Sequence, residues 1–293
     1  MIYSIYHYDN ALINQDIQRL YRDIFHVEME DEFQWRFIQN PQGKAISVIA
    51  RFQPDGVVAG HFSAMPCRVN LRGNKIDALI SMGMMVSNQY AGQGIGTVMS
   101  DYLFRHLEGD KYDLIIGFPN ENSFHMHINK MGYIHVRDYH FVTFSNQHNK
   151  NRQYYTELPS GFNIEEAPGD NKMFSLDREP KYLKWRYGRE KYTAFISDRE
   201  EVFIITRFQD KIDIVYWTPT ATVQDIRDFA DFVYHNFKAQ AVAAWDTLNF
   251  RSKECTVDPR KYHFCIKKLK KDLPEEILNG NEWIWLMGDS ELF

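Results

Sequence analysis

Three glycines alternate in the segment Gly92-Gln93-Gly94-Ile95-Gly96, and this segment constrains the fold more than any other part of the chain. It lies between residues 76–86, an apolar run typical of a buried strand, and residues 97–107, which have the spacing of an amphipathic helix. Glycine leaves backbone N–H groups open to a ligand, and the start of a helix has unpaired N–H groups with partial positive charge. The segment therefore predicts an anion-binding loop between a strand and a helix.

Two common phosphate-binding motifs do not fit this loop. A P-loop ends in Gly-Lys-Ser/Thr, whereas Gly96 is followed by Thr97 and Val98. A dinucleotide site has the pattern G-x-G-x-x-G after the first strand of a βαβ unit, but this loop reads G-x-G-x-G and follows strands joined by hairpin turns. A glycine-rich turn that binds no ligand stays an alternative at this point.

The periodicity of apolar residues around the loop predicts the order of the elements. We expect a helix at 11–25, strands at 45–52, 57–71 and 76–86, then, after the loop, a helix at 97–107, a strand at 112–118, a helix at 123–131 and a strand at 134–144. This order predicts an α/β (α+β) domain with a mixed sheet flanked by helices.

A second domain is predicted from the length of the chain and from a repeated pattern. The chain has 293 residues, and the polar segment 147–152 has no core-forming residue, so we place a boundary there, with domains at 1–147 and 148–293. Strands at 201–207 and 211–217, a helix at 222–237 and a strand at 241–245 repeat the core order of the first half. The second half is therefore a relative of the first or an unrelated α/β cap.

Residues 86–97, Val-Ser-Asn-Gln-Tyr-Ala-Gly-Gln-Gly-Ile-Gly-Thr, resemble the acetyl-CoA loop of the GNAT superfamily of N-acetyltransferases. In that family, a strand ending in valine and a short turn precede Arg/Gln-x-x-Gly-x-Gly/Ala. Residues 117–123, continuing to Lys130-Met131-Gly132-Tyr133, are similar to the family's next motif, an Asn-x-x-Ala/Ser helix that ends Lys-x-Gly-Phe/Tyr. The match covers about residues 10–145. Residues 182–187 and 283–293 are similar to segments of two-domain bacterial GNAT proteins. The expected second domain, at 148–293, is an α/β domain on the acceptor side, and a degenerate GNAT-like domain is one of its two interpretations.

The resemblance also implies which residues bind acetyl-CoA, the co-substrate, with no metal involved. Backbone groups of Met84, Met85 and Val86 would bind the pantetheine arm, like an added strand. Asn120 would contact the cofactor where two parallel strands separate. The pyrophosphate would be bound by backbone N–H groups of Gly92, Gln93, Gly94, Ile95, Gly96 and Thr97.

The family's usual catalytic acid is a tyrosine on the second helix, and this chain departs from that pattern. Counting forward from Asn120 places the acid at His127, whereas counting back from Gly132 places it at Ile128. Because imidazole titrates near neutrality, His127 is the candidate acid. The alternative is a histidine on the surface of the helix.

Other expected residues are also replaced. Ala91 stands at the Arg/Gln position of the loop, and residues 81–85 have no carboxylate where the family often has a glutamate base. His61 on the neighbouring strand is a candidate base that acts through water, or it is a strand residue that faces solvent. Two aromatic segments, at 182–187 and 283–293, predict either a surface that stacks a sugar or a base, or an aromatic core or domain-interface patch.

Composition excludes several other classes of protein. The formal net charge is −5, which lacks the basic character of a nucleic-acid-binding protein. Three widely spaced cysteines indicate neither a disulfide framework nor a zinc site. No apolar run approaches twenty residues and the first residues lack a signal-peptide pattern, so we expect no membrane partner and a cytoplasmic location.

The combined expectation is an N-acyltransferase that moves an acetyl group from acetyl-CoA to a primary amine, by direct attack in a ternary complex. The amine must first lose a proton, because a lysine-like amine has a pKa of ~10.4. The expected acceptor is a small molecule such as an amino sugar or a sugar nucleotide. The alternatives are a protein-lysine acetyltransferase and a non-catalytic CoA-binding regulatory protein.

Overall fold

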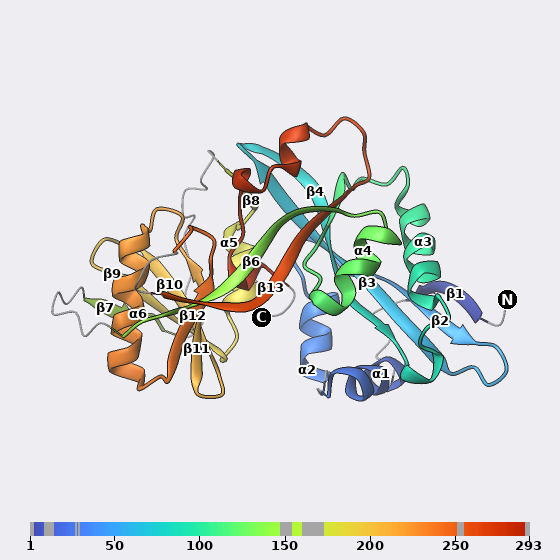
Figure 1. Ribbon diagram of the computed structural model, residues 1–293, viewed down its shortest axis with the longest axis horizontal. Helices are drawn as coiled ribbons and strands as arrows, with labels where there is room; N and C mark the ends of the chain where they lie inside the picture. The colour runs from blue at the N-terminus through green and yellow to red at the C-terminus, as the bar shows by residue number, and fades with distance from the viewer. Residues whose placement is uncertain are drawn as a thin grey trace. The chain divides into compact units, whose positions relative to one another are not determined.

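The computed structural model describes residues 3–8, 15–26, 28, 30–146, 154–159, 173–250 and 255–290. The chain forms two compact units, and each unit is built from separate stretches of the sequence (Figure 1). The first unit contains residues 1–69, 75–136 and 263–278, and the second contains residues 70–74, 137–262 and 279–293.

The first unit contains a mixed sheet with the strand order β1-β2-β3-β4-β5-β13. Its strands are β1 (Tyr3–Tyr8), β2 (Ile46–Phe52), β3 (Val58–Leu71), β4 (Asn74–Val86), β5 (Leu114–Gly117) and the end of β13 (Cys255–Lys268). Its helices are α1 (Gln15–Phe25), α2 (Glu30–Phe33), a π-helical turn (Gln34–Ile38), α3 (Ile95–Leu107) and α4 (Glu121–Asn129).

Helix α3 connects the two parallel strands of this sheet. β1, β2 and β3 pair antiparallel in sequence, whereas β4 and β5 run parallel, so the chain needs a crossover between them. β13 then pairs antiparallel with the other edge of β5, from Cys265 opposite Gly117 to Lys268 opposite Leu114. A strand from the C-terminal half of the sequence therefore completes the sheet of the first unit.

The core of the first unit is formed between this sheet and α3. Ile95, Met99, Leu103 and Leu107 repeat every four residues along α3, and all four side chains are buried. Figure 1 shows α3 beside β1 and β2, and burial of each of these side chains contributes about 2 kcal/mol. The amphipathic face of α3 thus fixes the loop that precedes the helix against the sheet.

The second unit contains strands in the order β6-β12-β11-β10-β9-β7. These strands are β6 (Ile134–Phe144), β7 (Tyr155–Glu157), β9 (Tyr192–Ser197), β10 (Val202–Phe208), β11 (Lys211–Trp217) and β12 (Ala241–Trp245). Its helices are α5 (Pro180–Tyr187) and α6 (Val223–Phe237), and β8 (Phe174–Leu176) pairs with β14 (Trp283–Ile284).

The core order predicted for the second half is confirmed. β10 and β11 form an antiparallel pair, α6 follows, and β12 returns parallel to β11. A capping box between Thr222 and Asp225 starts α6, which buries Ile226, Phe229 and Val233. β9 adds a strand that the sequence pattern did not predict.

The elements predicted around the glycine loop are also confirmed, with ends shifted by a few residues. Residues 11–14 of the first predicted helix and the predicted boundary segment 147–152 lie outside the described residues. The domain limits at 147 and 148 and the acceptor-side role of the second half stay predictions.

Candidate functional site

The glycine loop connects β4 to α3 through two residues in the left-handed region. Gly92 and Gly94 both have φ of 76°, a conformation that disfavours residues with a Cβ. A Cβ built at either position meets no atom within 4 Å, so the space beside both glycines is open. Gly92, Gln93 and Gly94 are exposed, whereas Ile95 and Gly96 are buried at the start of the helix.

The first turn of α3 presents unpaired N–H groups beside this open space. The first intrahelical hydrogen bond runs from the Val98 N–H to the Gly94 carbonyl at 3.1 Å. The N–H groups of Ile95, Gly96 and Thr97 precede this bond and therefore have no partner within the helix. Among the described residues, no side chain caps this turn, and the turn contains no acidic residue. These groups and the helix dipole favour an anion such as a phosphate.

Strand β1 anchors the loop, a role that the sequence pattern did not reveal. The Tyr3 hydroxyl donates a hydrogen bond to the side-chain oxygen of Gln93. The Tyr3 ring also contacts the edge of the buried Tyr90 ring, with centroids 6.0 Å apart. Both contacts join residues far apart in the sequence, which is why local periodicity could not predict them.

The parallel pairing of β4 and β5 ends before β4 reaches the loop. Their parallel ladder consists of three residue pairs and ends where Ile80 lies opposite Ile116. The predicted pantetheine-binding residues, Met84, Met85 and Val86, lie beyond the end of this ladder. Their backbone groups are therefore past the point where β5 is the hydrogen-bonding neighbour of β4.

Two methionines pack against the start of α3. A Cβ at Gly96 would lie 3.2 Å from Sδ of Met126 in α4 and 3.7 Å from Sδ of Met84 in β4. The structure thus brings two predicted site residues, Met84 and Gly96, together with a third residue that the sequence did not indicate. Met126 is part of a flexible, polarisable wall that can adapt to a ligand.

Asn120 is the N-cap of α4. Its Oδ1 accepts hydrogen bonds from the N–H groups of Asn122, at 3.1 Å, and Ser123, at 3.2 Å. The side chain is exposed, and its amide nitrogen is separate from this cap. The predicted contact with a cofactor can therefore use only the Nδ2 group or the backbone without breaking the cap.

His127 is buried between α4 and the end of β5, with 6% of its surface exposed, so the alternative of a surface histidine is wrong. Its Nδ1 lies 2.9 Å from the Ser123 carbonyl, and its ring packs edge-on against Tyr133 with centroids 5.1 Å apart. A Cβ at Gly117 would lie 3.6 Å from the His127 ring and 3.1 Å from Ser81 Oγ. His127 thus lies where β4 and β5 separate.

The environment of His127 determines which proton transfer it can perform. A carbonyl only accepts, so Nδ1 carries the proton, and in the neutral ring Nε2 has a lone pair. Burial lowers the pKa of His127 below its ordinary value of 6.5, which keeps the ring neutral at pH 7. A neutral ring favours acceptance of a proton over the acid role predicted from the sequence.

His61 does not face solvent, which corrects one of the two sequence-based interpretations. Its side chain is fully buried on β3, and burial lowers its pKa to about 4. Nδ1 lies 3.1 Å from the Gly83 carbonyl and Nε2 lies 2.9 Å from Ser63 Oγ. Because both ring nitrogens are hydrogen-bonded to the protein, His61 is a poor candidate for a base that acts through water.

The described parts of the two C-terminal aromatic segments form core, as one of the sequence-based interpretations predicted, and residues 291–293 lie outside the described residues. Tyr182, Tyr187, Trp283 and Trp285 are all buried, and the two tryptophans stack with centroids 5.5 Å apart. Arg186 is also buried, and its guanidinium donates to the carbonyls of Gly288 and Ser290 at 2.6 and 2.7 Å. These residues therefore stabilise the second unit, and their rings are not a surface that stacks a sugar.

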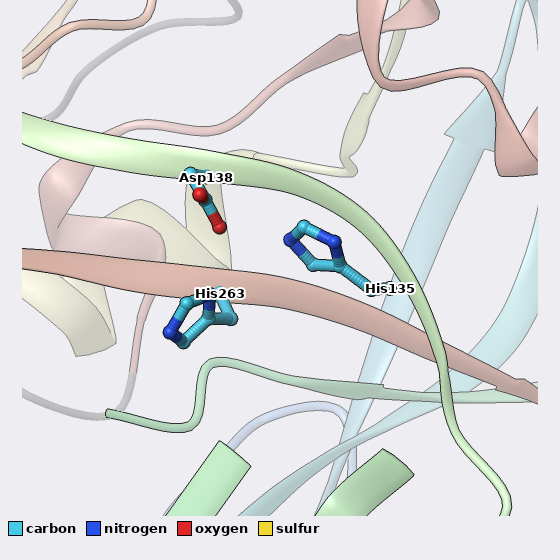
Figure 2. A group of neighbouring side chains, drawn as sticks. All are labelled: His135, Asp138 and His263. Carbon is cyan, nitrogen blue, oxygen red and sulfur yellow. The ribbon is translucent and has the colours of Figure 1, made fainter. Parts of the chain in front are cut away.

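Three side chains with the chemistry of metal ligands lie close together, as Figure 2 shows. They are His135 and Asp138 of β6 and His263 of β13, and their candidate ligand atoms lie within 4.8 Å of one another. Asp138 forms an ion pair of 2.8 Å with Lys261. His263 stacks on Phe124 at 3.8 Å, and its Nε2 lies 3.4 Å from Glu121. Asp138 and His263 therefore each have a partner within the chain as well.

Cys67, Cys255 and Cys265 are free thiols, as the spacing predicted. Within the part of the chain that the structure describes, no helix combines the length and the apolar character that a membrane span requires.

Comparison with known proteins identifies the fold and the domain family. The sequence model of one protein family, the acetyltransferase (GNAT) domain, matches residues 14–135. A GCN5-related N-acetyltransferase from Anabaena variabilis is 13% identical, with a TM-score of 0.68, over 92% of this chain and 73% of that protein. A GCN5-related N-acetyltransferase from Kribbella flavida is 10% identical, with a TM-score of 0.63, over 91% of this chain and 71% of that protein.

A third similar structure belongs to a larger protein. It is the GCN5-related glucosamine N-acetyltransferase region of a fungal multi-domain GH3 β-N-acetylglucosaminidase. It is 13% identical, with a TM-score of 0.62, over 90% of this chain and 38% of that protein. No protein of curated function matches the sequence. At these identities the solved structures establish a shared fold, and the match to the acetyltransferase (GNAT) domain is limited to residues 14–135.

Proposed function

We propose that this chain is an acetyltransferase of the GNAT superfamily, whose domain model matches residues 14–135, and that it transfers an acetyl group from acetyl-CoA to a small-molecule primary amine. The observation that carries the proposal is the loop at Gly92–Gly96. It combines two left-handed glycines, open space beside them and an uncapped helix start, and it follows the part of β4 that no longer pairs with β5.

The pyrophosphate and the pantetheine arm of acetyl-CoA each have a counterpart in this geometry. The pyrophosphate would be bound by the N–H groups of the loop and of the first turn of α3, from Gly92 to Thr97. The pantetheine arm would lie along the backbone of Met84, Met85 and Val86, where β5 no longer pairs with β4. Asn120 would add a contact through its amide nitrogen while its oxygen caps α4.

The reaction needs one proton to leave the amine and one to reach the departing thiolate. The neutral amine attacks the thioester carbonyl, the C–N bond forms, and the C–S bond breaks to give the acetylated amine and CoA. A backbone N–H near Val86 would stabilise the negative charge on the carbonyl oxygen of the tetrahedral intermediate. His127 is our candidate for proton transfer, since its ring is buried near the end of β5 and its Nε2 can accept a proton.

We favour an amino sugar or a sugar nucleotide as the acceptor. One protein that shares the fold is named for glucosamine N-acetylation, and this supports the choice of the first amines to test. A protein lysine stays the alternative acceptor, and the two acceptors differ in size and in the pKa of the amine.

A non-catalytic CoA-binding protein is the rival proposal. It is favoured by Ala91 at the position of the family's Arg/Gln, by the lack of a carboxylate at 81–85, and by the lowered pKa of His127. Both proposals predict binding of CoA, so only turnover distinguishes them.

The first experiment measures thermal unfolding with acetyl-CoA, with CoA and with NAD. A ligand at a hundred times its dissociation constant raises the stability of the folded state by about 2.7 kcal/mol. We expect acetyl-CoA and CoA to raise the unfolding temperature, and NAD to leave it unchanged. If millimolar acetyl-CoA leaves it unchanged as well, the binding site and the acetyltransferase activity are both wrong.

The second experiment follows free thiol released from acetyl-CoA in the presence of glucosamine, a sugar nucleotide with a free amine, a polyamine and a lysine peptide. Release that depends on one amine supports catalysis and identifies the acceptor class. Binding without release from any of these amines would favour the regulatory protein.

A further inference from the structure

A buried chain of hydrogen bonds crosses three strands of the first unit. Ser47 of β2 lies opposite Ser63 of β3 in the strand register, and their Oγ atoms are 2.6 Å apart. Ser63 Oγ lies 2.9 Å from Nε2 of His61, and Nδ1 of His61 lies 3.1 Å from the Gly83 carbonyl of β4. His61 and Ser63 are two residues apart on one strand, so their side chains share a face of the sheet.

The Gly83 carbonyl at one end of this network fixes the direction of each hydrogen bond in the network. The Gly83 carbonyl can only accept, so His61 Nδ1 must carry the ring proton. Nε2 then has a lone pair and accepts from the Ser63 hydroxyl, which in turn accepts from the Ser47 hydroxyl. All three side chains are at most 1% exposed, which keeps the imidazole in this neutral form.

The network of hydrogen bonds ends at an unusual residue of β4. Gly83 has φ of 60°, in the left-handed region, within a strand whose other residues are extended. A Cβ at this position would overlap the Tyr21 hydroxyl of α1, so any other residue would require Tyr21 to move and would be strained at this φ. Gly83 follows the last parallel pair with β5 by three residues and immediately precedes Met84.

Burial of two hydroxyls and an imidazole needs an explanation beyond packing. Apolar side chains of similar size would fill this region without the cost of removing three polar groups from water, which the hydrogen bonds only offset. A polar network that served packing alone could also end on another side chain. This network instead ends on the backbone of the residue where β4 changes conformation.

We infer that His61, held by Ser63 and Ser47, is a positioning residue that fixes the Gly83 peptide and thereby orients the backbone of Met84–Val86 toward the pantetheine arm of acetyl-CoA. The inference rests on the proposed function, because it assigns a role in the same site. The imidazole itself touches neither substrate. Its hydrogen bond to Gly83 holds the bend in β4, and the N–H and carbonyl groups after the bend depend on that orientation.

The test measures the dissociation constant of acetyl-CoA by calorimetry for the unaltered chain and three variants. His61→Leu removes the donor to Gly83, whereas His61→Asn keeps an N–H donor at the same distance along the side chain as Nδ1. Val69→Ala, in the same strand, leaves a cavity that costs about 2 kcal/mol of stability and serves as the control for destabilisation. All four proteins are compared at a temperature at which each is folded.

We expect His61→Leu to weaken acetyl-CoA binding about tenfold. This corresponds to the loss of about one hydrogen bond between the backbone of β4 and the pantetheine arm. His61→Asn should recover affinity to within about threefold of the original, and Val69→Ala should change it less than about twofold. Rescue by asparagine is the readout that a packing role would not produce, because asparagine fills the space of histidine poorly.

The possible failures are distinguishable. If the unaltered chain does not bind acetyl-CoA, the proposed function is wrong. If that chain binds but His61→Leu binds equally well, or if Val69→Ala loses as much affinity as His61→Leu, the positioning role is overturned. Should His61→Leu fail to fold, Ser63→Ala replaces it: the ring then lacks the group that holds Nε2, and unchanged affinity would overturn the inference.

Discussion

Gly94 combines backbone strain with open space. The effects of a substitution on stability and on ligand binding can therefore be measured separately at this residue. Its φ of 76° disfavours any residue with a Cβ, yet a Cβ there meets no atom within 4 Å. We expect Gly94→Ala to lower the free energy of unfolding by only about 1 kcal/mol. Acetyl-CoA affinity should fall at least about tenfold, because the Cβ would enter the space proposed for the pyrophosphate.

Gly56 provides a matched control for this substitution. It has φ of 70° and open space around its Cβ position, but it lies in the turn between β2 and β3. Gly56→Ala should show the same loss of stability in urea unfolding with no change in acetyl-CoA affinity. Equal affinities for Gly94→Ala and Gly56→Ala would contradict a phosphate site at the loop.

The low pKa of His61 in the folded chain also predicts how the stability of the chain depends on pH. Its pKa is about 4 in the folded chain and 6.5 when exposed, so the unfolded chain binds more protons between these values. The stabilisation from the neutral ring is therefore complete above pH 6.5 and is lost as the pH falls toward 4. Between pH 7 and pH 5 this loss amounts to about 2 kcal/mol.

The measurement compares urea unfolding of the unaltered chain and His61→Asn at pH 7 and pH 5. The comparison is needed because Asp213, whose pKa burial raises to about 6, changes stability with pH in the opposite direction. We expect the drop in stability from pH 7 to pH 5 to be smaller by about 2 kcal/mol in His61→Asn. Identical drops would show that His61 does not stay neutral in the folded chain.

At the scale of elements, the N-cap of α4 and the proposed cofactor contact of Asn120 can be tested separately. Asn120→Ala removes both the cap and the amide nitrogen, so stability should fall by about 1 kcal/mol and acetyl-CoA affinity should also fall. Asn120→Ser keeps an N-cap oxygen without the amide donor. It should retain stability and still lose affinity, as thermal unfolding and calorimetry would show. Full affinity in Asn120→Ser would remove Asn120 from the cofactor site.

The elements predicted well from the sequence are those with strong local patterns. The apolar run of β4, the four-residue repeat of α3 and the Asn120 and Gly132 signals around α4 all depend on neighbours in the sequence. Strand β13 was not predicted, because Pro259 and several charged residues interrupt its pattern. Its partner β5 lies more than a hundred residues earlier, and local periodicity contains no information about such a pairing.

The candidate site also contains features that local sequence patterns predict and features that depend on tertiary packing. The glycine loop is a local feature, and the structure gives it the expected place between β4 and α3. The burial of His61 and His127, and the contacts of Tyr3 and Met126 with the loop region, depend on side chains that tertiary packing brings together. The sequence could identify these residue types but not their environments, and the environments determine their pKa values.

At the scale of the whole molecule, each compact unit takes elements from both halves of the sequence. β13 crosses from the second unit into the first, where its last residues pair with β5, and β6 of the first half pairs with β12. Both units also contain a parallel pair of strands connected by a helix, β4-α3-β5 and β11-α6-β12. This similarity supports the prediction of two related domains, whereas the exchange of strands predicts that neither half is independent.

A chain that ends at residue 147 tests this dependence. It lacks β13, so one edge of β5 loses its antiparallel partner and the core loses Phe264 and Ile266, which are fully buried. We expect residues 1–147 to lack cooperative thermal unfolding and dispersed amide resonances, because an unpaired edge and missing core side chains remove more stability than a small domain has. Acetyl-CoA should not bind to it.

The matched variant attaches residues 263–278 after residue 147 through a flexible Gly/Ser linker, which returns the missing strand without the second unit. If β13 is the missing element, cooperative unfolding should return, and acetyl-CoA should raise the unfolding temperature as it does in the full chain. Cooperative unfolding of residues 1–147 alone would instead support an autonomous first domain with its boundary at the polar segment 147–152. In that case β13 would add stability to β5 without being required for the fold, and the acetyl-CoA site would be complete within the first half.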